Sequence, residues 1–254
     1  MDSSSNEIKV VVAADAGYLV PLAAMVRSVL DHHRRGRLTV RALVRGTTEA
    51  DRARLADSWR ADPRTRVIVD PIDQVEFGPL VGFNGISVTT YTRLLLADLL
   101  PADWSRVIYL DADTIVCSDL RRLWEQPLKG RVIGAVQDDG VRYVSSPKGV
   151  REWRELGLSP TLPFFNAGVL LIDLDQWRER GIGRQALNFA LDRAGERIVC
   201  DQEALNTIVA GEWTPLPDGY NVSALRQALW AGRAAQGMPV PRTHIRHFTT
   251  RDKP

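Results

Sequence analysis

The sequence predicts an α/β fold with a mostly parallel central sheet and helices on both faces. Apolar runs of strand length alternate along the chain with segments whose apolar residues recur at helical spacing. No internal repeat interrupts this alternation, and no polar stretch has the character of an interdomain linker. The 254 residues, 44% hydrophobic and 25% charged, have an ordinary globular composition. We therefore expect a single domain over residues 1–254.

Six strands and four helices are expected in this alternation. Pro21 stands at a favourable first-turn position of a helix over 21–32. The pattern Thr48-x-x-Asp51 is typical of a capping box and predicts a helix that runs to about Arg60. The other expected helices cover 90–99 and 201–210, and the expected strands cover 9–13, 39–43, 66–69, 107–110, 131–136 and 168–172.

Three stretches are expected to be loops or lids. Residues 77–86 are rich in glycine, and residues 141–163 are polar and punctuated by proline. Residues 216–242 follow the last expected helix and contain three prolines.

Charge and cysteine content exclude several classes of protein. The 33 basic and 31 acidic residues give a net charge of +2, too balanced for a nucleic-acid binder driven by phosphate neutralisation. Cys117 and Cys200 provide neither a disulfide framework nor a zinc set, and they favour a reducing compartment. The first apolar run, 10–14, is too short for a signal peptide or a membrane span. We expect a cytoplasmic protein with no transmembrane segment.

Two carboxylates follow the expected strand at 107–110. Side chains alternate between the faces of a strand, so Asp111 and Asp113 can point to the same side. They would lie at the carboxyl end of a parallel strand, where open α/β sheets bind ligands. Two hard oxygen donors suit Mg²⁺ or Mn²⁺, with the other ligands from phosphate and water. The alternative is a turn in which Asp113 caps a following helix.

The chain resembles the family 8 retaining glycosyltransferases, the glycogenin-like and bacterial lipooligosaccharide galactosyltransferase-like enzymes. The resemblance implies a GT-A-type, Rossmann-like fold, with a nucleotide- and metal-binding half over 8–140 and an acceptor-side half over 141–254. Six blocks carry it, in the family's order: Val11-Val12-Ala13-Ala14-Asp15 with Tyr18; Thr90-Tyr91-Thr92-Arg93-Leu94; the Asp-x-Asp region 106–124; Phe165-Asn166-Ala167-Gly168 with the apolar run after it; Asp201-Gln202-Glu203 with Leu205-Asn206; and the tail from His247 to Lys253-Pro254.

The resemblance implies a metal site and a diphosphate contact. Asp111, Asp113 and His247 would hold the divalent metal, usually Mn²⁺ in this family. A neutral imidazole is a good Mn²⁺ ligand, although a lone histidine in such a position is otherwise most often a surface residue. Lys253 would reach the diphosphate as a point charge.

The resemblance also implies a nucleotide site. The donor would be a UDP-sugar, with Asp15 at the base N–H and Tyr18 stacked on the ring. Ala13, Ala14 and Ala112 would line the same site, although small residues at 13 and 14 would equally suit close strand packing.

Five further positions would surround the donor sugar. Arg93 would contact the sugar and its phosphate, and Asn166 the sugar hydroxyls, although a surface arginine and a turn asparagine are the plain alternatives. Asp138, Asp201 and Gln202 would line the reacting face. Double displacement needs a nucleophile where Gln202 lies, and an amide is a poor one. We therefore expect front-face attack by the acceptor hydroxyl, with proton transfer to the leaving phosphate. Asp201 is the alternative nucleophile or only an N-cap.

Some positions depart from the family pattern. Ala16 and Gly17 stand where related enzymes often carry a second Asp or an Asn, so the base preference for uridine is less fixed. Thr250 replaces a usual glycine, which narrows the backbone approach to the diphosphate. The sequence ends at Pro254, before a tryptophan and the basic segment of some relatives, which favours a saccharide or small-molecule acceptor over a membrane glycolipid.

Three other functions fit parts of the pattern. A haloacid-dehalogenase-type phosphatase would use Asp111 as nucleophile and Asp113 as acid/base, with Asp138 and Asp139 as a distal pair. The short distance between the two pairs disfavours it. A sugar-nucleotide pyrophosphorylase would need a glycine-rich N-terminal loop that is missing. A non-catalytic sugar-nucleotide binding protein would keep both aspartates and lack turnover.

Overall fold

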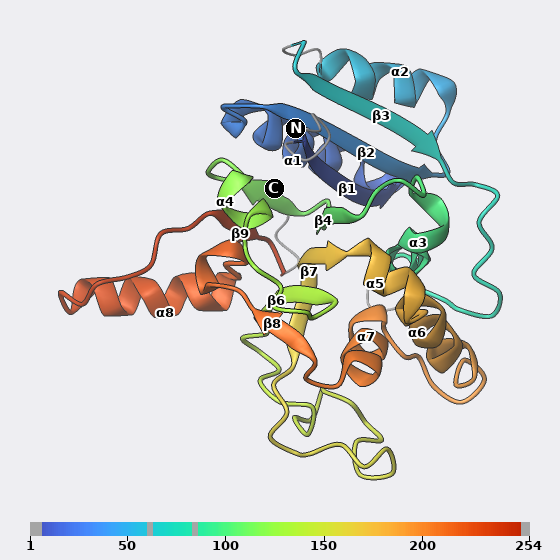
Figure 1. Ribbon diagram of the computed structural model, residues 1–254, viewed down its shortest axis with the longest axis vertical. Helices are drawn as coiled ribbons and strands as arrows, with labels where there is room; N and C mark the ends of the chain where they lie inside the picture. The colour runs from blue at the N-terminus through green and yellow to red at the C-terminus, as the bar shows by residue number, and fades with distance from the viewer. Residues whose placement is uncertain (1–6, 60–62, 83–85, 250–254) are drawn as a thin grey trace. The chain divides into compact units, whose positions relative to one another are not determined.

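The computed structural model describes residues 7–59, 63–82 and 86–249 (Figure 1). Seven strands form one mixed sheet in the order β3-β2-β1-β4-β7-β6-β8, and two short strands, β5 and β9, pair separately. The predicted α/β fold with a mostly parallel sheet is confirmed. The chain divides into two compact units, which are described here one at a time. Unit 1 comprises Met1–Asp73, Ile108–Gln126 and Pro217–Pro254, and unit 2 comprises Gln74–Val107 and Pro127–Leu216.

The sheet strands of unit 1 are parallel; β1, β2 and β4 are largely buried, whereas the edge strand β3 is partly exposed. β1 pairs with β2 on one side and with β4 on the other, and β2 pairs with β3. Val10, Val11 and Val12 are completely buried, as expected for a parallel strand covered on both faces. The strands are β1 (Glu7–Asp15), β2 (Arg37–Arg45), β3 (Thr65–Pro71) and β4 (Arg106–Leu110).

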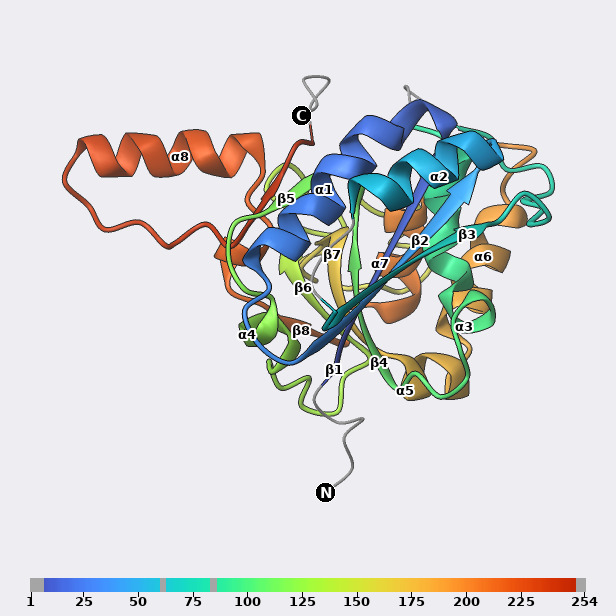
Figure 2. The ribbon, with the colours of Figure 1, turned by 90° about the horizontal axis from the view of Figure 1, so that it is seen from above.

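Two helices lie side by side over β1 to β3: α1 (Leu19–His32) and α2 (Glu49–Ser58) (Figure 2). α1 begins two residues before Pro21 and buries its apolar face. The capping box is confirmed, because the Thr48 hydroxyl accepts from the Asp51 N–H at 3.1 Å and the Asp51 carboxylate accepts from the Thr48 N–H at 3.0 Å. α2 ends at Ser58, and Arg60 lies outside the described residues.

The later parts of unit 1 contain short elements and one longer helix, α8. The expectation that 216–242 is only a loop is wrong, because α8 spans Ala224–Ala235 within it and is capped by the Ser223 hydroxyl. α8 extends away from the strands of its own unit in both views (Figures 1 and 2). The other elements are β5 (Thr114–Val116), α4 (Arg121–Trp124), the 3₁₀ turn η4 (Asp218–Tyr220) and β9 (Ile245–His247); a further 3₁₀ turn, η2 (Ala16–Tyr18), follows β1.

Unit 2 is built around β7, with β6 antiparallel to it and β8 parallel to β6. The β6–β7 register shifts between Ala135 and Val136. The helix expected over 90–99 is mostly 3₁₀, in a segment whose three threonines and valine lower the propensity for an α-helix. The elements of unit 2 are η3 (Val88–Leu95), α3 (Leu96–Leu99), β6 (Ile133–Gln137), β7 (Phe165–Asp173), α5 (Leu174–Glu179), α6 (Ile182–Leu191), α7 (Asp201–Val209) and β8 (Trp213–Pro215).

The loop expected at 141–163 is confirmed as a segment of turns with one isolated bridge, between Tyr143 and Pro163. It is ordered by a small core in which Val144, Val150 and Phe164 are buried. Within the described part of the chain, no helix combines the length and the apolarity needed to cross a membrane.

Candidate functional site

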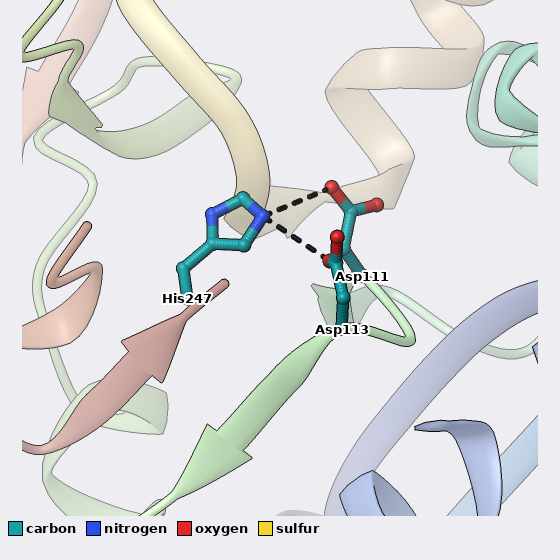
Figure 3. Close-up of side chains that lie close together, drawn as sticks. All are labelled: Asp111, Asp113 and His247. Carbon is teal, nitrogen blue, oxygen red and sulfur yellow. Dashed lines mark ion pairs between the residues drawn. The ribbon is translucent and has the colours of Figure 1, made fainter. Parts of the chain in front are cut away.

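Three side chains of unit 1 converge just beyond the end of β4: Asp111, Asp113 and His247 (Figure 3). The His247 Nε2 lies 3.2 Å from an oxygen of Asp113 and 3.7 Å from an oxygen of Asp111. One potential ligand atom from each residue falls within 4.8 Å of the other two. Such spacing would let a single ion contact all three.

The backbone fixes this convergence through the pairing of β5 with β9. Thr114 lies opposite His247 in the antiparallel register, and the Phe248 N–H donates to the Asp113 carbonyl at 3.0 Å. The turn before β5 is closed by Thr114, whose N–H and hydroxyl both donate to the Asp111 carbonyl. Asp113 is followed by a strand and not by a helix, so the alternative in which it caps a helix is wrong.

The donor set suits a divalent cation. The side chains of Asp111, Asp113 and His247 are 21%, 13% and 6% exposed, so the carboxylates are largely shielded but reachable. Two carboxylates and one imidazole are the ligands that Mn²⁺ and Mg²⁺ accept, with more from water or phosphate. These residues therefore fit a metal ion.

Two further residues, which the sequence did not predict, form hydrogen bonds with these ligand side chains. The Tyr109 hydroxyl donates to Asp111 Oδ1 at 3.0 Å, and Asn221 Oδ1 lies 2.9 Å from His247 Nδ1. Tyr109 could have been suspected, because it lies on β4 two residues before Asp111, and side chains two residues apart in extended backbone point to the same side. Asn221 has no local signal in the sequence.

The expected nucleotide loop follows β1, whose neighbour β4 leads to Asp111. Because β1 and β4 are parallel, Asp15 and Asp111 both emerge at the carboxyl edge of the sheet. Asp15 caps the 3₁₀ turn, and its carboxylate accepts from the Gly17 N–H at 2.8 Å. Tyr18 is half-buried, whereas Ala14 is 4% and Ala112 5% exposed. Ala13 is half-buried on the same strand.

In unit 2, Arg93 is ion-paired with Asp201. The Arg93 Nε lies 2.6 Å from Asp201 Oδ2, and both side chains are less than 10% exposed. Arg93 also donates to the Ala167 carbonyl at 2.6 Å, and the Thr90 hydroxyl donates to Asp201 Oδ1 at 2.9 Å. Arg93 is thus a buried residue and not a surface arginine of an amphipathic helix, which was the plain alternative.

A second cluster in unit 2 surrounds the Asp138 carboxylate. One oxygen accepts from the N–H groups of Gly140 and Val141, both at 2.8 Å. The other accepts from the Asn166 amide at 2.9 Å and the Gln202 amide at 3.2 Å. The Gln202 Oε1 in turn accepts from the Ala167 N–H at 2.9 Å. Both ends of the Gln202 amide are therefore engaged, and its orientation is fixed.

Helix α7 carries Asp201 and Gln202 in its first turn. Its N-cap is Cys200, whose sulfur accepts from the Glu203 N–H at 3.4 Å, so Asp201 is not the N-cap. Burial raises the pKa of the Cys200 thiol to about 12, with a further contribution from Asp201. Asn206 joins α7 to β7, because its amide bonds both the N–H and the carbonyl of Phe165.

The predicted site residues thus form two groups, one in each unit. Lys253 and Thr250 lie outside the described residues. Unit 1 brings together Asp111, Asp113 and His247 and places Ala13, Ala14, Asp15, Tyr18 and Ala112 at the same end of its strands; unit 2 brings together Arg93 with Asp201, and Asp138 with Asn166 and Gln202.

Comparisons of the sequence and of the structure with known proteins all indicate the same family. The model of glycosyl transferase family 8 matches residues 9–254. General stress protein A of Bacillus subtilis is 26% identical over 215 residues, 84% of this chain and 72% of that protein. Glycosyltransferase GlyF of Streptococcus pneumoniae is 29% identical over 252 residues, 96% of this chain. The match spans only 56% of GlyF.

Solved structures agree with this. The galactosyltransferase LgtC, in complex with donor and acceptor sugar analogs, has a TM-score of 0.77 and 28% identity, over 97% of this chain and 88% of LgtC. An active-site mutant of LgtC has a TM-score of 0.78 and 26% identity, over 97% and 89%. These similarities leave no place for the phosphatase interpretation of Asp111 and Asp113. The chain belongs to glycosyltransferase family 8, and it is a glycosyltransferase enzyme.

Proposed function

We propose that the protein is a metal-dependent, retaining glycosyltransferase that moves a hexose from a UDP-sugar to a hydroxyl group of a saccharide or small molecule. The observation that carries the proposal is the convergence of Asp111, Asp113 and His247 on one point beside the carboxyl ends of β1 and β4. Similarity to LgtC, whose structure holds donor and acceptor sugar analogs, supports the classes of donor and acceptor.

In this proposal Asp111, Asp113 and His247 hold a divalent cation, Mn²⁺ or Mg²⁺. The bound cation supplies charge neutralisation for the departing diphosphate. Without the cation, the two carboxylates would repel a diphosphate at this site. Nucleotide binding should therefore depend on metal. Lys253 is proposed as a second positive charge at the diphosphate.

The nucleotide is proposed to bind at the end of β1. Tyr18 would stack on the base, and Asp15 would accept from a base N–H with the lone pairs that its bond to Gly17 leaves. Ala13, Ala14 and Ala112 would allow close approach of the ribose and diphosphate. Small side chains at these positions suit a ligand that must reach the metal.

The residues of unit 2 are proposed to act on the sugar. Arg93, Asn166 and Asp138 would position its hydroxyls. Asp201 is ion-paired with Arg93, which lowers the nucleophilicity of its carboxylate. The Gln202 oxygen is already bound by the Ala167 N–H. This geometry favours front-face attack by the acceptor, in which the leaving phosphate oxygen takes the hydroxyl proton, over a covalent sugar adduct on either residue.

We also propose a cytoplasmic location. We further propose that the chain is one catalytic domain, in which residues 8–140 bind the nucleotide and the metal and residues 141–254 bind the acceptor. The free thiols of Cys117 and Cys200 support the location.

Calorimetry tests the donor and the metal together. UDP, GDP and dTDP are titrated into the protein with and without Mn²⁺. In a separate reaction with a UDP-sugar and a hydroxyl acceptor, the anomeric configuration of the product is read by NMR. We expect Mn²⁺-dependent UDP binding that Asp111→Asn/Asp113→Asn abolishes. The matched control is Asp31→Asn/Asp103→Asn, which removes two exposed carboxylates elsewhere. Metal-independent binding would contradict the proposal, and an inverted product would contradict the retaining mechanism.

The remaining alternative is a sugar-nucleotide binding protein without turnover. It predicts the same metal-dependent UDP binding but no release of sugar from the donor. Slow, Mn²⁺-dependent hydrolysis of a UDP-sugar in the absence of acceptor would decide for the enzyme. The same control variant should hydrolyse the donor normally.

A further inference from the structure

We propose that Asn221 is a positioning residue: its side-chain carbonyl fixes the tautomer of His247, so that the Nε2 lone pair faces the space between Asp111 and Asp113. The proposal rests on the metal site of the proposed function and deepens it. Asn221 lies outside the blocks that carry the family resemblance in the sequence.

The contact itself is short and buried. Asn221 Oδ1 lies 2.9 Å from His247 Nδ1, and the two residues are 4% and 5% exposed. A carbonyl oxygen can only accept, so the imidazole must donate from Nδ1. In a neutral imidazole the proton on Nδ1 leaves Nε2 as the bare nitrogen. Figure 3 shows Nε2 directed at the two aspartates and the other ring nitrogen turned away from them.

The alternative tautomer would prevent His247 from binding a cation. With the proton on Nε2, the imidazole would donate to the Asp113 oxygen at 3.2 Å and offer no lone pair to a cation. Without a partner for Nδ1, the nearby carboxylates would favour this arrangement, because they are the stronger acceptors. The Asn221 carbonyl opposes it from the other side of the ring.

The backbone around Asn221 leaves the side chain little freedom. The Val222 N–H donates to the Ile245 carbonyl, and the His247 N–H donates to the Val222 carbonyl, both at 2.9 Å. The His244 N–H donates to the Gly219 carbonyl at 2.7 Å. Residues 219–222 are therefore fastened along β9. Burial also keeps water from replacing the amide, so this hydrogen bond has no solvent substitute.

Removing the residue that hydrogen-bonds to a metal-bound histidine typically lowers metal affinity 10- to 100-fold. For Asn221→Leu, which keeps the shape and removes the acceptor, we expect Mn²⁺ affinity to fall by about this factor. Asn221→Asp keeps an acceptor oxygen and should bind Mn²⁺ at least as tightly as the parent protein. Free Mn²⁺ is measured by electron paramagnetic resonance, without nucleotide or substrate.

The tautomer is read directly by ¹⁵N NMR of metal-free protein labelled at histidine, at a pH where the ring is neutral. The chain has four histidines, and the signal missing from His247→Gln identifies the one of interest. We expect a protonated Nδ1 and a bare Nε2 in the parent and in Asn221→Asp. In Asn221→Leu the proton should shift to Nε2.

A matched control removes a buried hydrogen bond elsewhere in unit 1. Thr39→Val deletes the bond from the buried Thr39 hydroxyl to Glu7 at 2.6 Å, and it should change neither the tautomer nor Mn²⁺ affinity. A proton on Nε2 in the parent, or unchanged Mn²⁺ affinity in Asn221→Leu, would overturn the assignment. If the parent binds no Mn²⁺, the proposed function fails, while the NMR measurement still decides the role of Asn221.

Discussion

Thr114 lies directly opposite His247 in the antiparallel pair of β5 and β9. The two aspartates precede Thr114 by one and three residues, so strand pairing delivers the histidine to them. The Phe248 N–H closes the pair on the Asp113 carbonyl. The geometry of the candidate metal site therefore depends on the residues that support the β5–β9 pair and the ligand side chains. These residues can be tested one at a time.

Removing the Tyr109 hydroxyl should weaken the metal site with little effect on the fold. Tyr109→Phe deletes the bond to Asp111 Oδ1, and we expect about a tenfold loss of Mn²⁺ affinity. The free energy of unfolding should fall by about 1 kcal/mol. Calorimetric titration with Mn²⁺ and thermal unfolding measure the two effects. The control Tyr91→Phe removes a buried hydroxyl that bonds the Val199 carbonyl, and it should lower stability alone.

The buried Arg93–Asp201 pair should be costly to break from one side. Arg93→Met leaves the Asp201 carboxylate buried without its cation, and we expect a loss of about 3–5 kcal/mol in the free energy of unfolding. Urea denaturation measures it. Arg27→Met interrupts the exposed pair with Asp31 and should cost less than about 1 kcal/mol. Equal losses in the two variants would show that burial of the Arg93 pair is not what matters.

Gln202→Glu should be sensitive to pH. The new carboxylate would face Asp138 Oδ2 where the amide N–H now donates at 3.2 Å, so repulsion raises the pKa of the introduced group. When folding raises the pKa of a carboxyl group, the stability of the protein falls as pH rises above the pKa of that group in the unfolded chain. We expect a small loss near pH 4.5 and a loss about 1–3 kcal/mol larger at pH 8. Melting temperatures across this range measure it, with the exposed Gln227→Glu as control. A loss independent of pH would contradict the repulsion.

Cys200 should resist alkylation. Burial raises the pKa of its thiol to about 12 from an ordinary 9.0, so at pH 8 about a thousandfold less thiolate is present. Iodoacetamide labelling followed by peptide mass spectrometry should modify Cys200 only after unfolding in urea. The raised pKa also implies that its contribution to stability is complete below about pH 9 and declines as pH rises toward 12. Rapid labelling of the folded protein at pH 8 would refute this.

Two glycines offer a paired test of the region after residue 217. A Cβ at Gly219 would overlap the Arg242 carbonyl oxygen, so Gly219→Ala should push residues 219–222 off β9 and lower both stability and Mn²⁺ affinity. Gly232 lies inside α8 with open space where its Cβ would be. Gly232→Ala should therefore stabilise the protein by up to about 1 kcal/mol and leave Mn²⁺ binding unchanged. Thermal unfolding and Mn²⁺ titration of both variants provide the comparison.

The parts of the fold that follow local rules could be predicted. The apolar run before Asp111 and the capping box at Thr48 each specify their element from a few neighbouring residues. η3 was expected as an α-helix because its apolar residues have helical spacing, whereas its β-branched residues lower the propensity for an α-helix. α8 was missed because the prolines that flank it indicate a loop, although its apolar residues recur at helical spacing.

Local spacing predicted the Asp111 and Asp113 part of the candidate site, and the family resemblance supplied the rest. His247 occupies the last position of a three-residue strand, and only the resemblance of the tail that begins with it marks it as a metal ligand. The Arg93–Asp201 pair and the amides around Asp138 join segments far apart in the chain, so local spacing contains no trace of them. Asn221 was missed for the same reason.

The pairing of β5 with β9 also sets the order of events during synthesis. A ribosome that has reached residue 240 has made both aspartates and the strand that follows them, but not the histidine that lies opposite Thr114. Until β9 has emerged, β5 exposes an unpaired edge, and the two carboxylates can attract a cation only weakly and without the imidazole. The three candidate ligands are therefore brought together only after most of the sheet has been synthesised.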